Sequence, residues 1–291
     1  MILIDYSQVA VAGILAFSAD IKKNKDASEK KNLIRHVVLS SIKSYKKKYG
    51  NEYGQIVIAC DGRNYWRKDF FANYKGLRKK ARDESDLDWK IIFETLNEIR
   101  EDLKEHFKYK VIHVDRAEAD DVIAVLAEST QEFGKYEPVM IVSSDKDFKQ
   151  LHAHDNVKQF SPMLKKLITI KSKKELHAWL IEHIVKGDSG DGIPNILSPD
   201  NTLMEGVRQK PVSSKRLQDF IDNGFIACKT EEERRNWQRN ATLVDFKYIP
   251  EEVKNTILDA FEVEPKGNKM AIMNYLIKHK CRLLLDDIEE F

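Results

Sequence analysis

The sequence predicts an α/β fold with a mainly parallel central sheet flanked by helices, followed by a smaller helical part. Over the first 150 residues, short apolar runs rich in β-branched residues alternate with long amphipathic stretches, as strands and helices do in α/β proteins. From Ser172 onward the chain turns largely helical, with Gly and Pro residues between Gly187 and Pro211. We therefore expect an α/β domain over residues 1–180 and a helical domain over residues 181–291.

Strands are expected where apolar residues follow one another without alternation. Four such runs stand at Met1–Ile4, Gln55–Cys60, Lys110–Val114 and Pro138–Val142. Continuous apolar runs are typical of parallel strands, which helices cover on both faces. Further along, Val157–Pro162 and Leu167–Ile170 predict a short hairpin.

Apolar residues spaced three and four apart predict three helices between these strands. They are Ser28–Tyr49, Ser85–Phe107 and a helix that starts near Glu118. Gly50 is the expected end of the first helix, because glycine tolerates the left-handed backbone found there. Ser85 and Asp88 have the spacing of a capping box at the start of the second.

The composition excludes several classes of protein. Of the 291 residues, 42% are hydrophobic and 33% are charged, which excludes a disordered chain and a small disulfide scaffold. The longest apolar run, Val9 to Phe17, is far shorter than the roughly 20 residues that span a bilayer, so we expect no membrane association. Three cysteines without metal-ligand spacing indicate reduced thiols in a cytoplasmic protein.

Acidic residues stand where the predicted strands end. Asp5, Asp61, Asp115 and Asp145 follow the four apolar runs, and Glu118, Asp120, Asp121 and Asp147 come shortly after two of them. Ligands of parallel α/β sheets bind beyond the carboxyl ends of the strands, so folding gathers these carboxylates at one edge. Like charges about 4 Å apart repel by roughly 4 kcal/mol at an effective dielectric near 20. Either some of these acids protonate or cations neutralise them, and oxygen-only ligand sets suit Mg²⁺ or Mn²⁺.

Two interpretations of these acids stay open. Two divalent ions about 3.5–4 Å apart would stabilise the attacking and leaving oxygens in phosphodiester hydrolysis. Each aspartate taken singly is also explained as a helix N-cap or a turn residue, and an acidic helix start answers the helix dipole. In a regular helix Glu118 and Asp121 share a face while Asp120 points elsewhere, so joint metal binding requires an irregular helix start. If the aspartates were only helix caps that happen to follow the strands, they would not need to converge on one place. Their expected convergence therefore favours the metal site.

The segment from residue 63 to residue 82 is strongly basic and contains one acid, Asp69. Its basic residues are Arg63, Arg67, Lys68, Lys75, Arg78, Lys79, Lys80 and Arg82, with five aromatic residues interleaved. Basic groups neutralise phosphates and aromatic faces stack on unpaired bases, so the segment indicates nucleic-acid binding beside the acidic edge. The alternative is a solvated helix surface whose aromatic side packs on the core.

Six motifs occur in a fixed order along residues 3–194. They are Leu3-Ile4-Asp5, Ile58-Ala59-Cys60-Asp61, Tyr74-Lys75-Gly76-x-Arg78, Glu118-Ala119-Asp120-Asp121, Ser143-Ser144-Asp145-Lys146-Asp147-Phe148 and Lys186-Gly187-Asp188-x-x-Asp191-Gly192-Ile193-Pro194. Together they resemble the 5′ nuclease (flap endonuclease) superfamily, and within it the ribonuclease H branch of T-even-like phages. Each motif is weak alone, whereas the combination of the last three is highly specific.

The resemblance implies a phosphodiesterase that uses two Mg²⁺ ions, with Mn²⁺ as a substitute. By position, Asp5, Asp61, Asp120 and Asp145 match the ligands of the first ion, with Glu118 close by, and Asp147, Asp188 and Asp191 match those around the second. Lys75 and Arg78 match basic catalytic residues near the scissile phosphate. Asp121 matches a family position where it could hold a ligand in place, and Asp115 has no counterpart, so the cap interpretation is kept for Asp115.

The resemblance also implies where nucleic acid binds. Residues of about 63–90 would form an arch over the substrate, with Arg63, Arg67, Lys68, Tyr74, Lys79, Lys80 and Arg82 as contacts. The helical domain would hold the duplex through a modified helix–three-turn–helix, with contacts from Arg208, Lys215 and Arg216. The insertion after Pro194 departs from the family pattern, so the duplex contacts of residues 195–216 stay open.

The implied activity is hydrolysis from the 5′ end of RNA–DNA and DNA–DNA duplexes and cleavage of 5′ flaps or forks, which removes RNA primers during phage DNA replication. The enzyme would act as a monomer in the host cytoplasm, with single-strand-binding protein or a sliding clamp as candidate partners. A haloacid-dehalogenase phosphatase needs a second acid two residues after Asp5, where Ser7 stands, and a Toprim fold would not explain Asp188 and Asp191. A non-catalytic, structure-specific DNA-binding protein remains the alternative.

Overall fold

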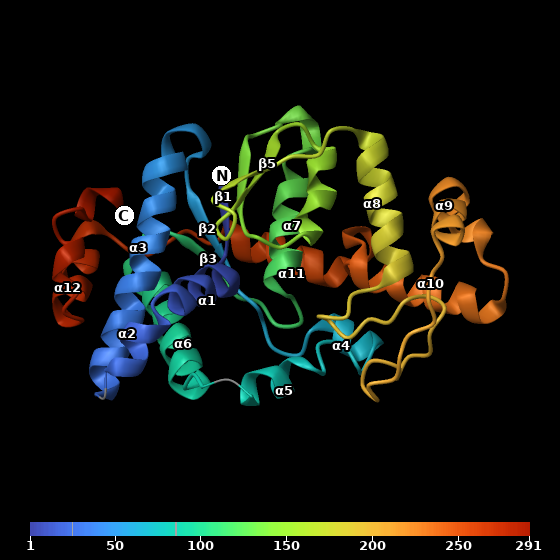
Figure 1. Cartoon of the computed structure of the whole chain (residues 1–291). Helices are drawn as coiled ribbons and strands as arrows, with labels where there is room; N and C mark the ends of the chain where they lie inside the picture. The colour runs from blue at the N-terminus through green and yellow to red at the C-terminus, as the bar shows by residue number, and fades with distance from the viewer. Residues whose placement is uncertain (25, 85) are drawn as a thin grey trace.

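The computed structural model describes residues 1–24, 26–84 and 86–291 and contains one six-stranded sheet with helices on both faces (Figure 1). The strands are β1 (Ile2–Asp5), β2 (Ile56–Ala59), β3 (Lys110–Ile112), β4 (Val139–Val142), β5 (Val157–Ser161) and β6 (Lys166–Ile168). Their order is β3-β2-β1-β4-β5-β6. The first five are parallel and β6 pairs antiparallel with β5. The predicted mainly parallel sheet and the hairpin are both confirmed.

Strand β1 lies at the centre of the sheet and separates two cores. Ile2, Leu3 and Ile4 are fully buried. Because side chains alternate between the faces of a strand, Ile2 and Ile4 belong to one core and Leu3 to the other. This burial on both faces explains why the sequence shows a continuous apolar run.

Helices from distant parts of the chain cover the two faces of the sheet. The first face carries α1 (Tyr6–Ala16), α3 (Ala27–Tyr53), α6 (Trp89–His106) and α12 (Lys269–Lys278), with α2 (Ser18–Lys23) beside them. The second carries α7 (Ala119–Ser129) and α11 (Glu251–Glu262). Figure 1 shows α3 and α6 on one side of the strands and α7 and α11 on the other. The chain from Glu251 onward therefore lies against the sheet again.

Two predicted helix ends differ from the structure. Helix α3 continues through Gly50 to Tyr53, and Gly54 takes the left-handed position after it, with φ +79°. The N–H of Gly54 donates to the carbonyl of Gly50 at 2.8 Å, so Gly50 is not the end of the helix. Helix α6 begins at Trp89, where the Asp88 side chain accepts from the N–H of Ile91. Ser85, expected in that cap, lies outside the described residues.

A third core holds the helical part and reaches back to the sequence after β2. It contains side chains of α8 (Lys173–Lys186), α9 (Ser214–Asn223) and α10 (Glu231–Val244). Phe71 and Tyr74, just after α4 (Trp66–Phe70), belong to the same core. The short helix α5 (Arg78–Asp83) follows, and the 3₁₀ turns are η1 (Glu132–Gly134), η2 (Asp147–Ala153), η3 (Gly224–Ala227), η4 (Phe246–Tyr248), η5 (Arg282–Leu284) and η6 (Ile288–Glu290). The segment after β2 thus joins the sheet to the helical core. Division into domains at residue 180 stays a prediction.

Within the described residues, every helix is too short or too polar to cross a lipid bilayer.

Candidate functional site

Carboxylates from three adjacent strands and one helix start converge at the carboxyl edge of the sheet. Asp5 is the last residue of β1, Asp61 follows β2, Asp145 follows β4, and Asp120 lies in the first turn of α7. Asp5 is 6% exposed. It accepts hydrogen bonds from the N–H of Gln8 at 3.1 Å and from the Ser143 hydroxyl at 3.0 Å. Asp5 therefore caps α1 and also joins the cluster, so the two interpretations of this residue are compatible.

The acids of this cluster raise one another's pKa. Burial and the nearby Asp61 raise the pKa of Asp5 to about 7. Burial and Asp145 raise the pKa of Asp120 well above its ordinary value. Burial and Asp147 raise the pKa of Asp145. These groups are hard oxygen donors that resist joint ionisation without a cation, so the donor chemistry fits a divalent metal ion.

The raised pKa of Asp5 predicts a pH-dependent gain in stability when Asp5 is replaced by asparagine in the metal-free protein. Between pH 3.8, the ordinary pKa, and about 7, the unfolded chain releases the Asp5 proton while the folded chain keeps it. The contribution of Asp5 to stability therefore falls as pH rises through this window, whereas asparagine has no proton to lose. Thermal unfolding in EDTA at about pH 4, 5.5 and 8 measures the effect. An equal difference between variant and wild type at all three values would contradict it.

The start of α7 is held by a buried ionic cluster. Glu118 and Asp121 are fully buried, and each pairs with the Arg67 guanidinium at 2.8 Å. Asp121 also accepts from the N–H of Glu118 at 3.0 Å and from the Trp66 indole at 3.1 Å. Burial opposes ionisation of Glu118, but Lys75 and Arg67 outweigh it and lower its pKa. Asp121 thus fixes the helix start behind Asp120, and Glu118 contacts cationic side chains of the protein.

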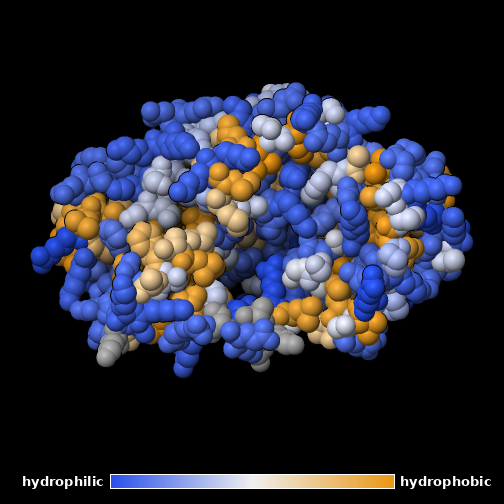
Figure 2. All heavy atoms as spheres, in the orientation of Figure 1, coloured by the Kyte–Doolittle hydropathy of each residue, from blue (hydrophilic) through white to orange (hydrophobic). Residues whose placement is uncertain are grey.

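A second acidic group lies beside the first. Asp147 opens η2, and Asp188 and Asp191 follow α8. Asp188 pairs with Lys146 at 2.7 Å, and Asp191 pairs with Arg78. A cavity of about 510 Å³ reaches both groups, lined by Arg78, Ser144, Asp145, Lys146, Asp147, Asp188, Gly190 and Asp191. The molecular face in Figure 2 is hollowed near its centre, and hydrophilic residues line the hollow.

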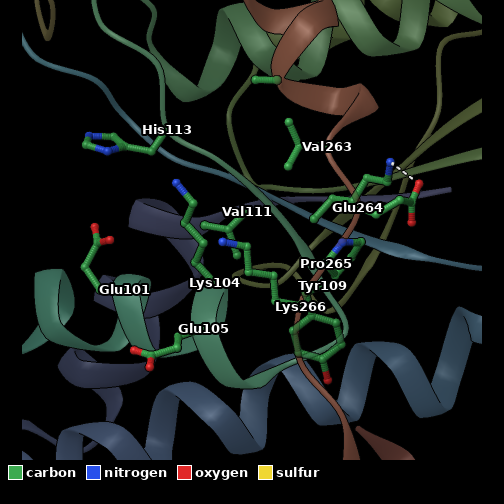
Figure 3. A pocket seen from close by; sticks show the side chains of 12 residues that line it. Glu101, Lys104, Glu105, Tyr109, Val111, His113, Val263, Glu264, Pro265 and Lys266 are labelled. Carbon is green, nitrogen blue, oxygen red and sulfur yellow. Dashed lines mark hydrogen bonds and ion pairs between the residues drawn. The ribbon is translucent and has the colours of Figure 1, made fainter.

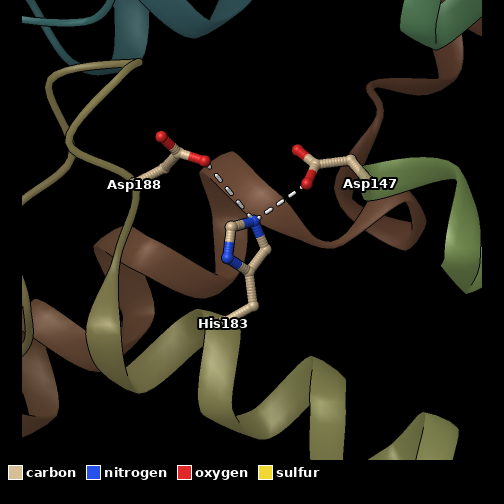
Figure 4. A group of neighbouring side chains, drawn as sticks. All are labelled: Asp147, His183 and Asp188. Atoms are coloured by element: carbon tan, nitrogen blue, oxygen red, sulfur yellow. Dashed lines mark ion pairs between the residues drawn. The ribbon is translucent and has the colours of Figure 1, made fainter. Parts of the chain in front are cut away.

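The sequence did not point to His183, which lies within this second group (Figure 4). Its Nε2 atom is 3.0 Å from Asp147 Oδ1 and 3.9 Å from Asp188 Oδ2. The available signal was its position near the end of a helix, five residues before Asp188. None of the six sequence motifs contains a histidine, so the motifs gave no reason to single out His183. The ion pair of Lys146 with Asp188 was not predicted either, because the sequence shows Lys146 only as part of a motif.

Lys75 connects the two acidic groups. Its ammonium pairs with Glu118, and its backbone N–H donates to the carbonyl of Asp191 at 2.8 Å. Burial lowers the pKa of Lys75, but Glu118 and Asp191 outweigh it and raise the pKa, so the side chain stays charged. Gly192 permits this contact, because a Cβ there would lie 2.7 Å from the carbonyl oxygen of Asn73. The structure therefore brings Lys75 and Arg78 to the acids, as the sequence predicts.

The predicted nucleic-acid contacts divide into exposed and buried residues. Exposed or partly exposed side chains are Arg63, Lys68, Arg82, Arg208 and Lys215. Arg67 and Tyr74 are each 3% exposed, so the expectation that they bind nucleic acid is corrected: both are held in the ionic cluster under α7. Arg216 pairs with Asp219 and Glu233 at 2.8 and 2.6 Å, so its charge is largely neutralised. The side chains of Lys79 and Lys80 lie outside the described residues.

The aromatic residues of the basic segment mostly follow the core interpretation. Trp66, Phe71 and Tyr74 are buried, while Phe70 is 49% exposed. Asp115 is exposed and does not line the cavity beside the acids. A separate cavity of about 350 Å³ lies at the outer strand β3 (Figure 3), where it is lined by side chains such as Glu101, Lys104 and Glu264. None of the predicted metal ligands lines it.

Comparisons with known proteins relate the whole chain to phage nucleases. Residues 1–180 match the family model described as 5′-3′ exonuclease, N-terminal resolvase-like domain, and residues 175–291 match the model described as T4 RNase H, C terminal. The chain is 36% identical to Ribonuclease H of Enterobacteria phage T4, over 99% of this chain and 95% of that protein. It is 29% identical to the Exonuclease of Escherichia phage T7, over 66% of this chain and 55% of that protein.

Solved structures share the fold at lower identity. The T5 D15 protein co-crystallised with metal ions superposes with a TM-score of 0.60 at 18% identity, over 90% of this chain and 99% of that one. The D15 flap endonuclease of bacteriophage T5, as the D155K variant in a pseudo-enzyme-product complex with DNA and metal ions, superposes with a TM-score of 0.59 at 19% identity. That alignment covers 90% of this chain and 99% of the T5 chain.

Proposed function

The chain belongs to the 5′-3′ exonuclease family and is a metal-dependent 5′ nuclease, and from this premise we propose that it degrades RNA–DNA and DNA–DNA duplexes from the 5′ end and cuts 5′ flaps. The observation that carries the proposal is the convergence of Asp5, Asp61, Asp120 and Asp145 beside Lys75 and Arg78. Anionic ligands for cations and fixed cationic side chains together suit a polyanionic substrate. The relative from phage T4 is named ribonuclease H, which supports RNA primers as the substrate removed.

The proposed function assigns separate roles to the acidic and the basic residues of the site. Asp5, Asp61, Asp120 and Asp145 would hold one Mg²⁺ ion, and Asp147, Asp188 and Asp191 a second, with Mn²⁺ as a substitute. When bound, such ions activate water and stabilise charge on phosphate oxygens. Lys75 and Arg78 orient the scissile phosphate and stabilise the charge that develops on it. Arg63, Lys68 and Arg82 bind flanking phosphates on the exposed side of the arch.

The proposal includes the cellular location, the oligomeric state and the partner proteins. The whole-length similarity to a phage protein supports action in the host cytoplasm during phage DNA replication. A monomer suffices, because all the proposed ligands come from one chain. Single-strand-binding protein and a sliding clamp stay predicted partners.

Cleavage of three 5′-labelled substrates tests the function. An RNA–DNA hybrid, a nicked DNA duplex and a 5′ flap are incubated at matched salt with Mg²⁺ or with EDTA. We expect short products from the 5′ end with Mg²⁺ and none with EDTA. Tight binding of all three without hydrolysis would instead support the non-catalytic DNA-binding alternative.

Replacing Lys75 with alanine should slow single-turnover cleavage by about 10²-fold, because a fixed charge aimed at the phosphate is lost. Glu118 keeps Arg67 and the Tyr74 hydroxyl as partners, so the fold should persist. Rapid-quench measurement at saturating enzyme gives the rate of the chemical step. Lys108→Ala, an exposed lysine outside the basic segment, is the control and should cleave at close to the wild-type rate. An unchanged rate in Lys75→Ala would leave Lys75 as a purely structural cation.

A further inference from the structure

The second acidic group contains a buried nitrogen donor whose role the proposed function does not use. His183 is 7% exposed, and its Nε2 atom has no hydrogen-bond partner among the described residues. The Oδ1 atom of Asp147 is buried and without a hydrogen-bond partner as well. Buried polar atoms normally have a hydrogen-bond partner, so two facing atoms without one indicate a missing third group.

The direction of Nε2 shows where that group would lie. Nε2 is 3.0 Å from Asp147 Oδ1, yet the two atoms do not form a hydrogen bond. Figure 4 shows Nε2 directed between Asp147 and Asp188, with one carboxylate on each side. An ordinary ion pair of a protonated imidazole would direct its N–H at one of the two oxygens. The ring is held by Trp179, which stacks on it at 5.4 Å between centroids.

The donor atoms are also spaced like metal ligands. One ligand atom each from Asp147, His183 and Asp188 lies within 4.8 Å of the other two. Around a six-coordinate ion with bonds of about 2.1 Å, neighbouring ligands lie about 3.0 Å apart and opposite ligands about 4.2 Å apart. The separations of Nε2 from the two oxygens, 3.0 and 3.9 Å, fall within that range.

We propose that Nε2 of His183 is a direct ligand of the second metal ion, together with Asp147 and Asp188, so that this site has a mixed nitrogen and oxygen donor set. The inference rests on the proposed function, which places an ion there. Imidazole binds transition-metal ions better than it binds Mg²⁺. The second site should therefore prefer Mn²⁺ over Mg²⁺ more strongly than the all-oxygen site formed by Asp5, Asp61, Asp120 and Asp145. Lys146, which is about half exposed, can move into solvent when the ion binds.

Pulsed electron paramagnetic resonance of the Mn²⁺-loaded full chain tests this assignment without any activity measurement. A nitrogen bound to Mn²⁺ modulates the spin echo, and ¹⁵N-labelling of histidine changes the modulation frequency. We expect a histidine-dependent modulation in the wild type. His183→Gln should lose it, while His177→Gln, an exposed position of the same helix, should keep it. Because the wild type with and without label answers the question, a variant that fails to fold does not spoil the test.

Calorimetric titration supplies the second readout. In His183→Gln, the Mn²⁺ affinity of one site should fall by about 10–100-fold, and the Mg²⁺ affinity by a smaller factor. Two bound Mn²⁺ ions without histidine modulation in the wild type would overturn the role of His183 and leave the proposed function intact. No heat with Mn²⁺ or Mg²⁺ would overturn both.

Discussion

Replacing Asp61 with asparagine should lower the turnover number by at least about 10²–10³-fold, the loss seen when one group that stabilises a transition state is removed. Asp61 accepts hydrogen bonds from the Ser7 hydroxyl at 2.8 Å and from the N–H of Ala119 at 3.0 Å. Asparagine can keep both contacts, since its oxygen accepts from the N–H and its amide donates to the hydroxyl. The fold and the exposed basic side chains should therefore survive, and only the anionic ligand is lost. Single-turnover cleavage of a 5′-labelled hybrid measures the loss.

Asp115→Asn is the matched control for this prediction. Asp115 also follows a strand of the sheet, but its side chain is exposed and does not line the cavity beside the acids. Its replacement should leave cleavage, DNA binding and unfolding temperature near those of the wild type. Wild-type turnover in Asp61→Asn would remove Asp61 from the metal site, whatever its position at the edge.

The acidic edge could be predicted from the sequence because one rule of parallel sheets determines it. Strands β2, β1 and β4 are neighbours and parallel, so residues that follow them must meet at one edge of the sheet. Asp5, Asp61 and Asp145 were therefore predicted without any knowledge of side-chain contacts. Asp120 needed one more fact, that α7 starts at Ala119 with Glu118 as its cap. Glu118 and Asp121 both contact Arg67, whereas Asp120 lies near Asp145 and Asp5, the separation that a regular helix start gives.

The roles of the basic residues could not be predicted, because they depend on contacts between distant parts of the chain. Arg67 and Lys68 are adjacent and look alike in a basic run, yet one is buried and the other exposed. Arg67 contacts residues far away in the chain: it pairs with Glu118 and Asp121, and it donates to the carbonyl of Leu243 at 3.0 Å across 176 residues. The role of His183 could not be predicted for the same reason, because its neighbour Asp147 lies on another element. Local patterns carry no information about such pairs.

Replacing Arg67 with methionine should lower the free energy of unfolding by about 3–5 kcal/mol, the usual effect of removing one member of a buried ionic cluster. Arg67 is 3% exposed, and Glu118 and Asp121 are fully buried. Methionine fills much of the volume but leaves Asp121 without its cation and Glu118 with Lys75 alone among charged partners. Denaturant titration of the metal-free protein measures the change.

The exposed neighbour provides the comparison that separates structure from substrate binding. Lys68→Met should change stability by no more than about 0.5 kcal/mol, as surface substitutions usually do, but should weaken the salt-dependent binding of DNA. Folded Arg67→Met should bind DNA with the wild-type salt dependence, because a buried guanidinium neutralises no phosphate. If Arg67→Met instead kept wild-type stability and lost DNA affinity, Arg67 would be a nucleic-acid contact and the buried cluster would be incidental. The expected results are therefore opposite for the two neighbours: Arg67→Met loses stability and keeps its DNA binding, whereas Lys68→Met keeps stability and loses DNA affinity. We expect this difference because the ionic cluster holds the start of α7, and with it Asp120, at the acidic edge.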